Sequence, residues 1–326
     1  MGYAVPGQNP LELVEAARQA ESLGYDSAWA AEAWGCDAVT PLAWLGAVTS
    51  RIKLGSAIMQ IPGRTPTNTA MTAATLDLLS GGRFLLGLGN SGPQVVEGWH
   101  GEPWGKPLVK TREYVEIVRA ALRREVVEHH GVHYDIPLSS GTGLGKPLKL
   151  MARPLRPDIP IYLASLAPKA IELAFEIADG WLPLFFSPER AAELFPMARA
   201  REGFDIAAGA QVIVCDDPRE GIEQLKPYFG FYLGGMGSRG TNFYNDIARR
   251  YGYEEEALRV QDLFLDGKPR EAAAAVPDGL VDDVALVGPP ERIRDRLDAW
   301  RESGVTTLLV AAKDPQSVRT MAELAA

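Results

Sequence analysis

The sequence predicts an α/β protein folded as a single parallel (β/α)8 barrel. Short apolar runs alternate with amphipathic segments along nearly the whole chain, and about eight of these runs read as strands. Strands that alternate with helices pair in parallel through right-handed crossovers. A length of 326 residues also suits one barrel domain, so we expect one domain over residues 1–326.

The elements follow in order from the apolar periodicity and from the residues that start and stop helices. A helical apolar stripe over Asn9–Leu23 ends at Gly24, and Thr40 with Pro41 begins the next helix, which runs through LAWLGAVT. Further helices are expected over Pro66–Leu79, Thr111–Arg123, Pro168–Ala178 and Pro188–Ala200. The expected strands are MGYAV, YDSAWA, IKLGSAIMQI, Phe84–Leu88, Ile159–Ala164, GWLPLFF, AQVIVC and TTLLVAA.

Three stretches interrupt this alternation and are expected as insertions at the C-terminal face of the barrel. Residues 91–110 and 128–150 are rich in Gly, Pro and aromatic residues, which is typical of irregular loops, and a polar helical region spans about 218–275. Within the second, EHHGVHY favours a hairpin turning at Gly131 over a metal site of His129, His130 and His133.

In the third insertion, GGMGSRGTNFYND predicts a Gly-rich turn before a helix capped by Thr241 or Asn242. Its glycines and Arg239 could hold an anion at that helix start, although a plain turn between helices is favoured.

Composition excludes several classes of partner. A net charge of −9 opposes binding to nucleic acid and to anionic membranes. Two cysteines, Cys36 and Cys215, leave no disulfide framework and no zinc cluster. The first residues do not form a signal peptide, and no apolar run approaches the ~18 residues of a membrane span. We therefore expect a cytoplasmic protein with a small-molecule substrate and no metal.

The stretch RFLLGLGNSGPQVVEGW raises the question of a ligand site, because an apolar strand runs directly into small residues. At the carboxyl end of a barrel strand, glycines let a ligand approach the backbone closely. A simple tight turn is the alternative, since the glycines lack the dinucleotide-binding spacing. In the loop that follows, His100 is the histidine best placed to face a substrate.

These residues carry a resemblance to a known family. RFLLGLGNSGPQVVEGWHGEPW, KTREYVEIVRAALRRE and GVHYDIP resemble the luciferase-like monooxygenase superfamily. EAWGCDAVTPLAWLGAVTSRIKLGSAIMQ, TAMTAATLDLLSGGRF and RPDIPIYLASLAPKAIELAFEIADGWLPLFFSPER are similar to its actinobacterial coenzyme F420-dependent oxidoreductases. The resemblance implies a TIM-barrel-like fold, hydride transfer between the deazaflavin and a small or medium organic substrate, and a homodimer formed through helices near the first strands.

The resemblance also implies site residues. It places a non-prolyl cis peptide between Ala57 and Ile58 behind the ring, with Gln60 on the same strand end and an acidic residue, Glu32, near the ring. The segment passing the ring matches Gly89, Asn90, Ser91 and Gly92. The segment receiving the phosphate-bearing tail through backbone amides matches Ala164, Ser165, Leu166, Ala167, Lys169 and Ala170.

Three departures from the family's sugar-phosphate dehydrogenases change the expected substrate. Ala33 stands where they carry a histidine, SGPQ with Gln94 stands where they carry a glutamate, and the first strand is short. We therefore expect a reductase of C=C, C=N or C=O, in which Glu32, Trp34, Gln94 and His100 orient the substrate or supply a proton. An FMN-dependent monooxygenase and a non-catalytic flavin- or deazaflavin-binding barrel are the alternatives.

Overall fold

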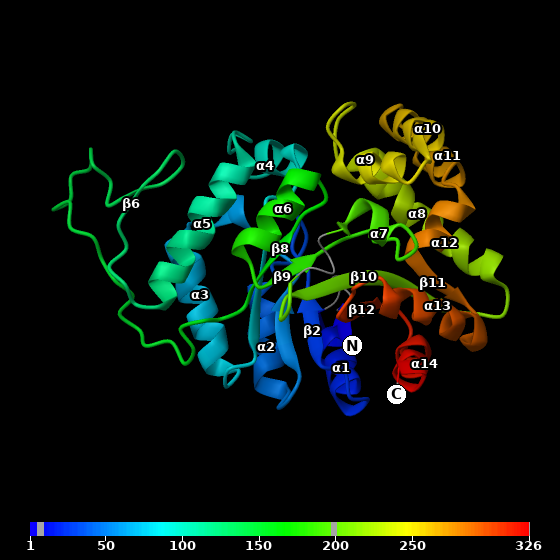
Figure 1. Ribbon diagram of the computed structural model, residues 1–326, viewed down its shortest axis with the longest axis horizontal. Helices are drawn as coiled ribbons and strands as arrows, with labels where there is room; N and C mark the ends of the chain where they lie inside the picture. Colours follow the sequence, from blue (N-terminus) through cyan, green and yellow to red (C-terminus); the bar gives the residue numbers. More distant parts are fainter. Residues whose placement is uncertain (5–9, 197–200, 326) are drawn as a thin grey trace.

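A closed ring of eight parallel strands forms the centre of the protein (Figure 1). The computed structural model describes residues 1–4, 10–196 and 201–325. Around the ring lie β1 (Gly2–Ala4), β2 (Ser27–Ala30), β3 (Lys53–Ser56), β5 (Phe84–Gly89), β8 (Ile161–Ala164), β9 (Gly180–Leu182), β10 (Asp205–Val214) and β12 (Thr307–Ala311). Pairing of β12 with β1 and of β9 with β10 closes the ring. The predicted (β/α)8 barrel is confirmed.

Helices surround the ring and cover one side of its mouth. The barrel helices are α1 (Pro10–Ser22), α2 (Val39–Val48), α3 (Pro66–Leu79), α5 (Pro107–Leu122), α6 (Pro168–Ile177), α13 (Pro290–Glu302) and α14 (Pro315–Ala325). The predicted helical insertion holds α8 (Pro218–Gly235), α9 (Phe243–Arg250), α10 (Glu254–Leu265) and α11 (Pro269–Ala274), followed by α12 (Asp278–Val284). In Figure 1, α9, α10 and α11 lie together above α8.

Large side chains fill the interior of the barrel where glycines on neighbouring strands leave room for them. Trp29 and Tyr162 lie edge to face with ring centroids 5.1 Å apart. A β-carbon on Gly55 would lie 2.2 Å from the Trp29 ring, and one on Gly180 would lie 2.3 Å from Tyr162. The interior is therefore a packed core rather than a channel.

The N-terminal face of the ring is tied together by Asp205 at the start of β10. Its carboxylate accepts hydrogen bonds from the hydroxyl of Tyr162 at 2.8 Å and from Thr307 Oγ1 at 2.8 Å, and it also contacts Thr306 Oγ1. Three strands, β8, β10 and β12, are thereby joined at one side chain.

Several predicted elements need correction. The single strand IKLGSAIMQI is two strands, β3 and β4 (Met59–Gln60), because a cis peptide between Ala57 and Ile58 interrupts the pairing; the short helix η1 (Ile61–Gly63) follows. Residues 91–110 are less irregular than expected, since Pro93 begins α4 (Pro93–Gly98) and Pro107 begins α5 four residues before Thr111.

Two further predictions fail late in the chain. The helix predicted over Pro188–Ala200 is only α7 (Ala191–Leu194) within the described residues, and residues 197–200 lie outside them. The chain turns after α7 so that Phe195 can pack on Trp181 and Phe186. A strand was also missed: β11 (Ala285–Gly288) pairs with the second half of β10, beside the closed ring.

Residues 128–150 include the predicted hairpin at the base of an extended segment (Figure 1). Strands β6 (His129–His130) and β7 (Asp135–Ile136) are antiparallel. The carboxylate of Glu113 on α5 accepts hydrogen bonds from the backbone N–H groups of Val132, His133 and Tyr134 at 2.7, 2.9 and 3.1 Å. The hairpin is therefore anchored to the barrel through one buried side chain.

Candidate functional site at the mouth of the barrel

The residues predicted for the site come from loops at one end of the barrel. Glu32 and Trp34 follow β2, Gln60 ends β4, and Gln94 and His100 belong to α4 and the loop after it. In a parallel barrel the carboxyl ends of all strands meet at the same face. The fold therefore brings segments from distant parts of the sequence to one mouth.

Glu32 is a fully engaged carboxylate. Arg64 binds it with both terminal nitrogens, at 2.5 and 2.8 Å, and the backbone N–H groups of Ala38 and Gln60 donate to it at 3.0 and 3.1 Å. Burial acts to raise the pKa of Glu32, but the hydrogen bonds from Arg64 and the two N–H groups together lower it below its ordinary value. This geometry favours Glu32 as an anchor of the surrounding loops over a donor of protons.

Gln60 links the loop after β2 to His100. Its side chain is buried, its Nε2 donates to the carbonyl of Ala33 at 2.7 Å, and its Oε1 lies 2.5 Å from His100 Nε2. Gly63 makes room for the imidazole, since a β-carbon there would lie 3.2 Å from His100 Cε1. Both ends of the Gln60 amide are therefore used within the protein, and its contact with a cofactor stays a prediction.

Trp34 and Gln94 face the helical insertion. Trp34 is 41% exposed and its ring centroid lies 6.0 Å from that of Phe231 on α8. Gln94 lines a surface hollow with Arg239 and Phe264 from the insertion. Arg239 pairs there with Asp262 at 2.8 Å and Asp266 at 3.3 Å. The ion pairs use Arg239 within the protein, which favours the turn reading of the Gly-rich segment over an anion site.

The end of β5 and the residues after it, Gly89 to Gly92, pack closely against neighbouring segments. The cis peptide between Ala57 and Ile58 stands where the resemblance predicts it, and β4 then pairs with β5 so that Gln60 lies opposite Gly89. A β-carbon on Gly89 would lie 2.4 Å from Ile58 Cδ1. Ser91 adopts a positive φ of 59°, and Gly92 is the N-cap of α4. The small residues keep β5 in contact with the cis peptide segment.

Asn90 is the one large side chain among the four matched ring-segment residues. Its Nδ2 donates to Thr111 Oγ1 at 2.6 Å. The amide therefore ties the end of β5 to α5.

The segment predicted to receive a phosphate lies at the start of α6. Ala164 ends β8, no side chain caps the helix at Ala167, and Lys169 and Ala170 occupy its first turn. Within the described residues, the buried Ser165 Oγ has no hydrogen-bond partner. An uncapped helix start beside an unpaired hydroxyl offers hydrogen-bond donors to an anionic ligand.

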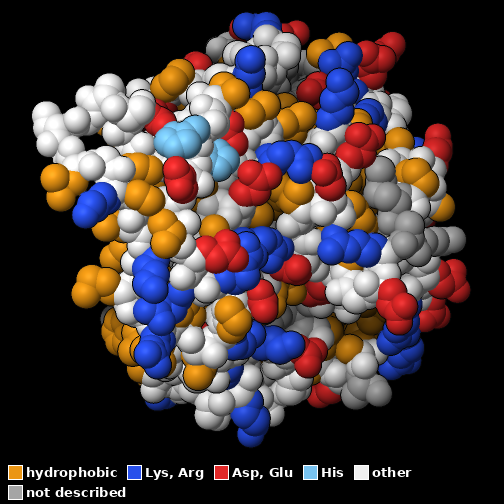
Figure 2. Space-filling model, turned by 60° about the vertical axis from the view of Figure 1, so that its left-hand side comes forward, with side chains coloured by type: hydrophobic (Ala, Val, Ile, Leu, Met, Phe, Trp, Pro, Cys, Tyr) orange, Lys and Arg blue, Asp and Glu red, His pale blue; other side chains and the backbone are white. Residues whose placement is uncertain are grey.

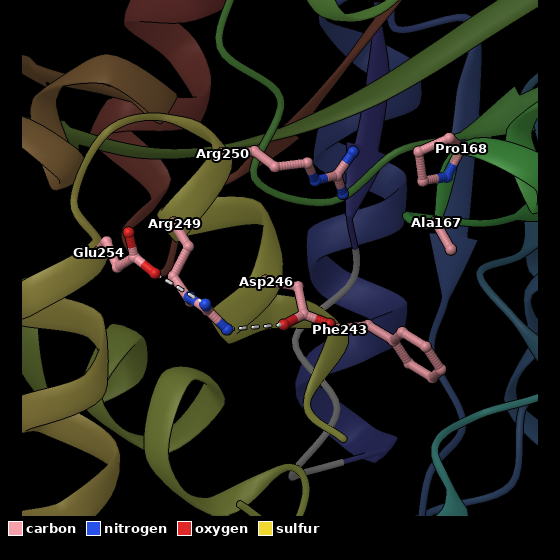
Figure 3. Close-up of a pocket in the computed structure, with 7 residues that line it drawn as sticks. All are labelled: Ala167, Pro168, Phe243, Asp246, Arg249, Arg250 and Glu254. Carbon is pink, nitrogen blue, oxygen red and sulfur yellow. Dashed lines mark hydrogen bonds and ion pairs between the residues drawn. The ribbon is translucent and has the colours of Figure 1, made fainter. Parts of the chain in front are cut away.

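A surface pocket adjoins this helix start (Figure 3). It is lined by Ala167 and Pro168 on one side and, on the other, by Phe243, Asp246, Arg249, Arg250 and Glu254. Arg249 pairs with Glu254 at 2.8 Å and with Asp246 at 3.7 Å, whereas Arg250 donates to the carbonyl of Leu166 at 2.6 Å. Burial lowers the pKa of Arg250. Arg250 is thus a half-buried cation beside the predicted phosphate segment.

Sequence reasoning missed Arg64 and Arg250. Arg64 lies 32 positions after its partner Glu32, and nothing in GRTPTN marks it except a single cation before a helix start. Arg250 lies near the Gly-rich turn, in which the sequence suggests Arg239 as the cation that could hold an anion. The predicted helix cap there is confirmed, because Asn242 accepts hydrogen bonds from the N–H groups of Tyr244 and Asn245 at 3.0 and 3.2 Å.

The histidine cluster lies in the hairpin. His130 Nδ1 lies 2.6 Å from Asp135, and His129 Nε2 lies 3.5 Å from Glu113. Among the residues that the structure describes, no group of three or more His, Cys, Asp or Glu side chains is arranged to hold a metal ion. The described helices also include none with the length and apolar character needed to cross a membrane.

Comparison with known proteins assigns the chain to a family. The model of the family described as luciferase-like monooxygenase matches residues 2–307. The chain belongs to the luciferase-like monooxygenase family. The predicted membership is confirmed, and the match extends from β1 to β12.

Curated relatives of the chain are named as an oxidoreductase and a reductase, and one name includes coenzyme F420. A Mycobacterium tuberculosis protein named "Putative coenzyme F420-dependent oxidoreductase" is 49% identical over 339 residues, covering 99% of this chain and 97% of that protein. The 5,10-methylenetetrahydromethanopterin reductase of Archaeoglobus fulgidus is 28% identical over 323 residues, covering 94% of this chain and 91% of the relative.

Solved structures of the family share the fold. The coenzyme F420-dependent tetrahydromethanopterin reductase of Methanopyrus kandleri superposes with a TM-score of 0.82 at 24% identity, covering 99% of this chain and 97% of that one. An F420-dependent secondary alcohol dehydrogenase, bound to an F420-acetone adduct, has a TM-score of 0.76 at 17% identity, covering 99% and 97%. At these identities the likeness supports the barrel architecture alone.

Proposed function

We propose that this protein is a coenzyme F420-dependent oxidoreductase that passes a hydride between the deazaflavin and a small or medium organic substrate, working as a reductase of C=C, C=N or C=O bonds. The observation that carries the proposal is the similarity to a relative named for coenzyme F420, which is 49% identical and covers 99% of this chain.

The residues present fit such a coenzyme. A flat ring would pass most easily along a strand end of small residues, and Gly89, Ser91 and Gly92 form such a strand end next to Ile58. A phosphate-bearing tail needs donors, and the uncapped start of α6, the unpaired Ser165 hydroxyl and Arg250 supply them. On a protein with net charge −9, an anionic ligand depends on local donors of this kind.

When bound, the deazaflavin supplies or accepts the hydride. The chain then has to hold the substrate at the ring, exclude water and manage one proton. Trp34 and Gln94 line the side of the mouth that faces the insertion. Glu32 and Arg64 neutralise each other, so the proton that the substrate needs would come from His100 or from the solvent.

The charges around the mouth favour an uncharged substrate. Arg64 is paired with Glu32, and Arg239, which shares a hollow with Gln94, is paired with two aspartates. Neither cation is free to bind a phosphate group of a substrate. This supports reduction of a neutral double bond over oxidation of a sugar phosphate.

Titration with coenzyme tests the proposal. Oxidised F420 and FMN are added separately to the purified protein, and binding is followed by fluorescence. We expect F420 to bind in the micromolar range and FMN not to bind. Gly89→Val should weaken F420 binding at least tenfold because a β-carbon there would lie 2.4 Å from Ile58 Cδ1 and displace the segment expected behind the ring, whereas Gly143→Ala, in open space on the extended segment, should not.

Turnover separates the proposal from its two alternatives. Reduced F420 and a panel of enones, imines and ketones should give absorbance changes of the coenzyme without oxygen uptake. Binding of FMN with oxygen uptake would favour the monooxygenase, and tight coenzyme binding without turnover on the whole panel would favour a non-catalytic barrel.

The same proposal includes a homodimer in the cytoplasm. Support comes from apolar side chains exposed on two neighbouring helices, Trp44 on α2 and Met71, Leu78 and Leu79 on α3. Figure 2, in which the side bearing α3 and β6 is turned forward, shows hydrophobic side chains gathered along the left edge beside Lys and Arg.

A further inference from the structure

We infer that Gln60 fixes the tautomer of His100, so that His100 exchanges its proton with the substrate only through Nδ1. The inference rests on the proposed reductase function, because it names the atom that would supply the proton for the same reaction. Gln60 acts in it as a positioning residue.

The orientation of the Gln60 amide follows from its partners. The carbonyl oxygen of Ala33 can only accept a hydrogen bond, so the group 2.7 Å from it is the Gln60 amide nitrogen. The amide oxygen therefore faces His100 Nε2. Because an amide oxygen cannot donate, Nε2 must carry the hydrogen of this contact.

Protonation of His100 then adds a hydrogen at Nδ1 and leaves Nε2 unchanged. Neutral imidazole with hydrogen on Nε2 has an unprotonated Nδ1, and the imidazolium adds its proton there. Gln60 Oε1 accepts from Nε2 in both forms. Nδ1 is not among the buried atoms that lack partners and makes no hydrogen bond within the described residues, so it is accessible to solvent.

The position of Gln60 is itself held on two sides. Its backbone N–H donates to Glu32 at 3.1 Å, and Glu32 is clamped by Arg64. Its side chain is 1% exposed, so water cannot substitute for its partners. The Arg64–Glu32 pair thus supports the residue that orients His100, although neither touches the imidazole.

The reduction balances with this assignment. With reduced F420 bound as the hydride donor, one atom of the substrate double bond would accept the hydride, and the π-electron pair would move to the other atom. That atom takes the proton from Nδ1 of the imidazolium, leaving oxidised coenzyme and neutral His100. Water at the mouth restores the proton to Nδ1.

Nitrogen-15 NMR of the histidine rings tests the tautomer without any coenzyme. In the wild type we expect neutral His100 with hydrogen on Nε2 and none on Nδ1. Gln60→Met, which keeps the length of the side chain and removes both amide atoms, should give a mixture of tautomers. His130, whose Nδ1 faces Asp135, is the internal reference for the opposite arrangement, and His130→Gln is the control variant.

Kinetics tests the consequence. His100→Gln should lower kcat by on the order of 10²-fold, the usual contribution of a general acid. Gln60→Met should lower kcat on the order of tenfold and alter its pH profile, with F420 binding and the KM for the acceptor nearly unchanged. His130→Gln should leave all of these as in the wild type.

Two results would overturn the inference: wild-type His100 with hydrogen on Nδ1 in its neutral form, or a Gln60→Met variant with wild-type NMR signals and pH profile. Failure of the protein to bind F420 would instead overturn the proposed function, because the tautomer is measured in the free protein.

Discussion

Glu32 and Arg64 show how a residue at the mouth is fixed before any ligand arrives. Their side chains are 9% and 18% exposed, and the bidentate geometry uses both carboxylate oxygens. Removing one partner from such a pair leaves the other charge buried, which costs far more than breaking a surface pair. The pair therefore matters for stability as well as for the position of Gln60.

This arrangement predicts a pH-dependent loss of stability in Glu32→Gln. At pH 7 the variant should unfold with a free energy about 3 kcal/mol lower than the wild type. Because the folded-state pKa of Glu32 lies below its ordinary value of 4.5, the stabilisation is present above that pH and is lost as the pH falls through the lower folded-state value. Denaturant unfolding of both proteins from pH 7 to pH 3 should show the difference shrinking.

A matched surface pair provides the control for that measurement. Glu176, 60% exposed, pairs with Arg112, and Glu176→Gln should leave unfolding almost unchanged at pH 7. A difference between wild type and Glu32→Gln that stays constant across the whole pH range would contradict the role given to the ionised carboxylate.

At this scale the sequence predicts positions better than contacts. The resemblance located Glu32, the Ala57–Ile58 bond and the residues after β5, because these follow strand ends in a recognisable order. It could not give Arg64 as the partner of Glu32, nor the Gln60 bridge to His100, because both are contacts across 32 to 40 positions that only the folded chain brings together. Arg250 of α9 was missed for the same reason, because its contact with Leu166 before α6 spans 84 positions.

Among the elements, the hairpin of β6 and β7 depends on a side chain from another element. Glu113 is 7% exposed and accepts three backbone N–H groups, and Gly131 is required at the turn because a β-carbon there would lie 2.4 Å from Glu113 Oε2. Burial acts to raise the pKa of Glu113, but these N–H groups together lower it, so the carboxylate is charged at neutral pH.

Replacing Glu113 should loosen the hairpin without unfolding the barrel. In Glu113→Ala, three N–H groups lose a charged acceptor, and hydrogen bonds to charged groups are worth about 1.5–3 kcal/mol each. Amide hydrogen exchange in residues 129–136 should accelerate at least tenfold, while exchange in the barrel strands stays as in the wild type.

Glu116 offers the control on the same helix, since its side chain points to solvent. In Glu116→Ala, amide hydrogen exchange in the hairpin and in the barrel should match that of the wild type. Acceleration spread equally over hairpin and barrel in Glu113→Ala would mean that the carboxylate supports the whole fold and not the hairpin alone.

The success of the predictions for elements depends on length and on boundary residues. Helices with proline or a capping residue at the start, such as α3 and α6, lie within one residue of their predicted bounds. Short elements were predicted poorly. The four-residue strand β11 follows a long helical stretch and was missed, and α7 is shorter than predicted because Phe195, directly after it, packs on Trp181. Tertiary packing therefore determines both the presence of β11 and the end of α7.

For the whole molecule, the exposed apolar face of α2 and α3 predicts the oligomeric state. Trp44, Met71, Leu78 and Leu79 are 46%, 54%, 59% and 62% exposed. Large apolar side chains exposed together on two neighbouring helices are typical of an interface between chains. Sizing with light scattering should give twice the mass of one chain across a hundredfold range of concentration.

Charged substitutions on that face should separate the two chains. Trp44→Arg combined with Leu79→Arg should give a monomer with an unchanged circular dichroism spectrum, because both side chains are already exposed. Leu258→Arg, at a residue 42% exposed on α10, is the matched control and should remain a dimer. A wild type that elutes as a monomer at every concentration would contradict the prediction.

The Asp205 junction has a consequence for how this protein can change over evolutionary time. It joins β8, β10 and β12 at the end of the barrel opposite the mouth, through a carboxylate that touches none of the predicted site residues. Substitutions in the loops after β2 and β5 therefore leave these contacts intact. The loops at the mouth can thus vary in sequence while the far end keeps the ring closed.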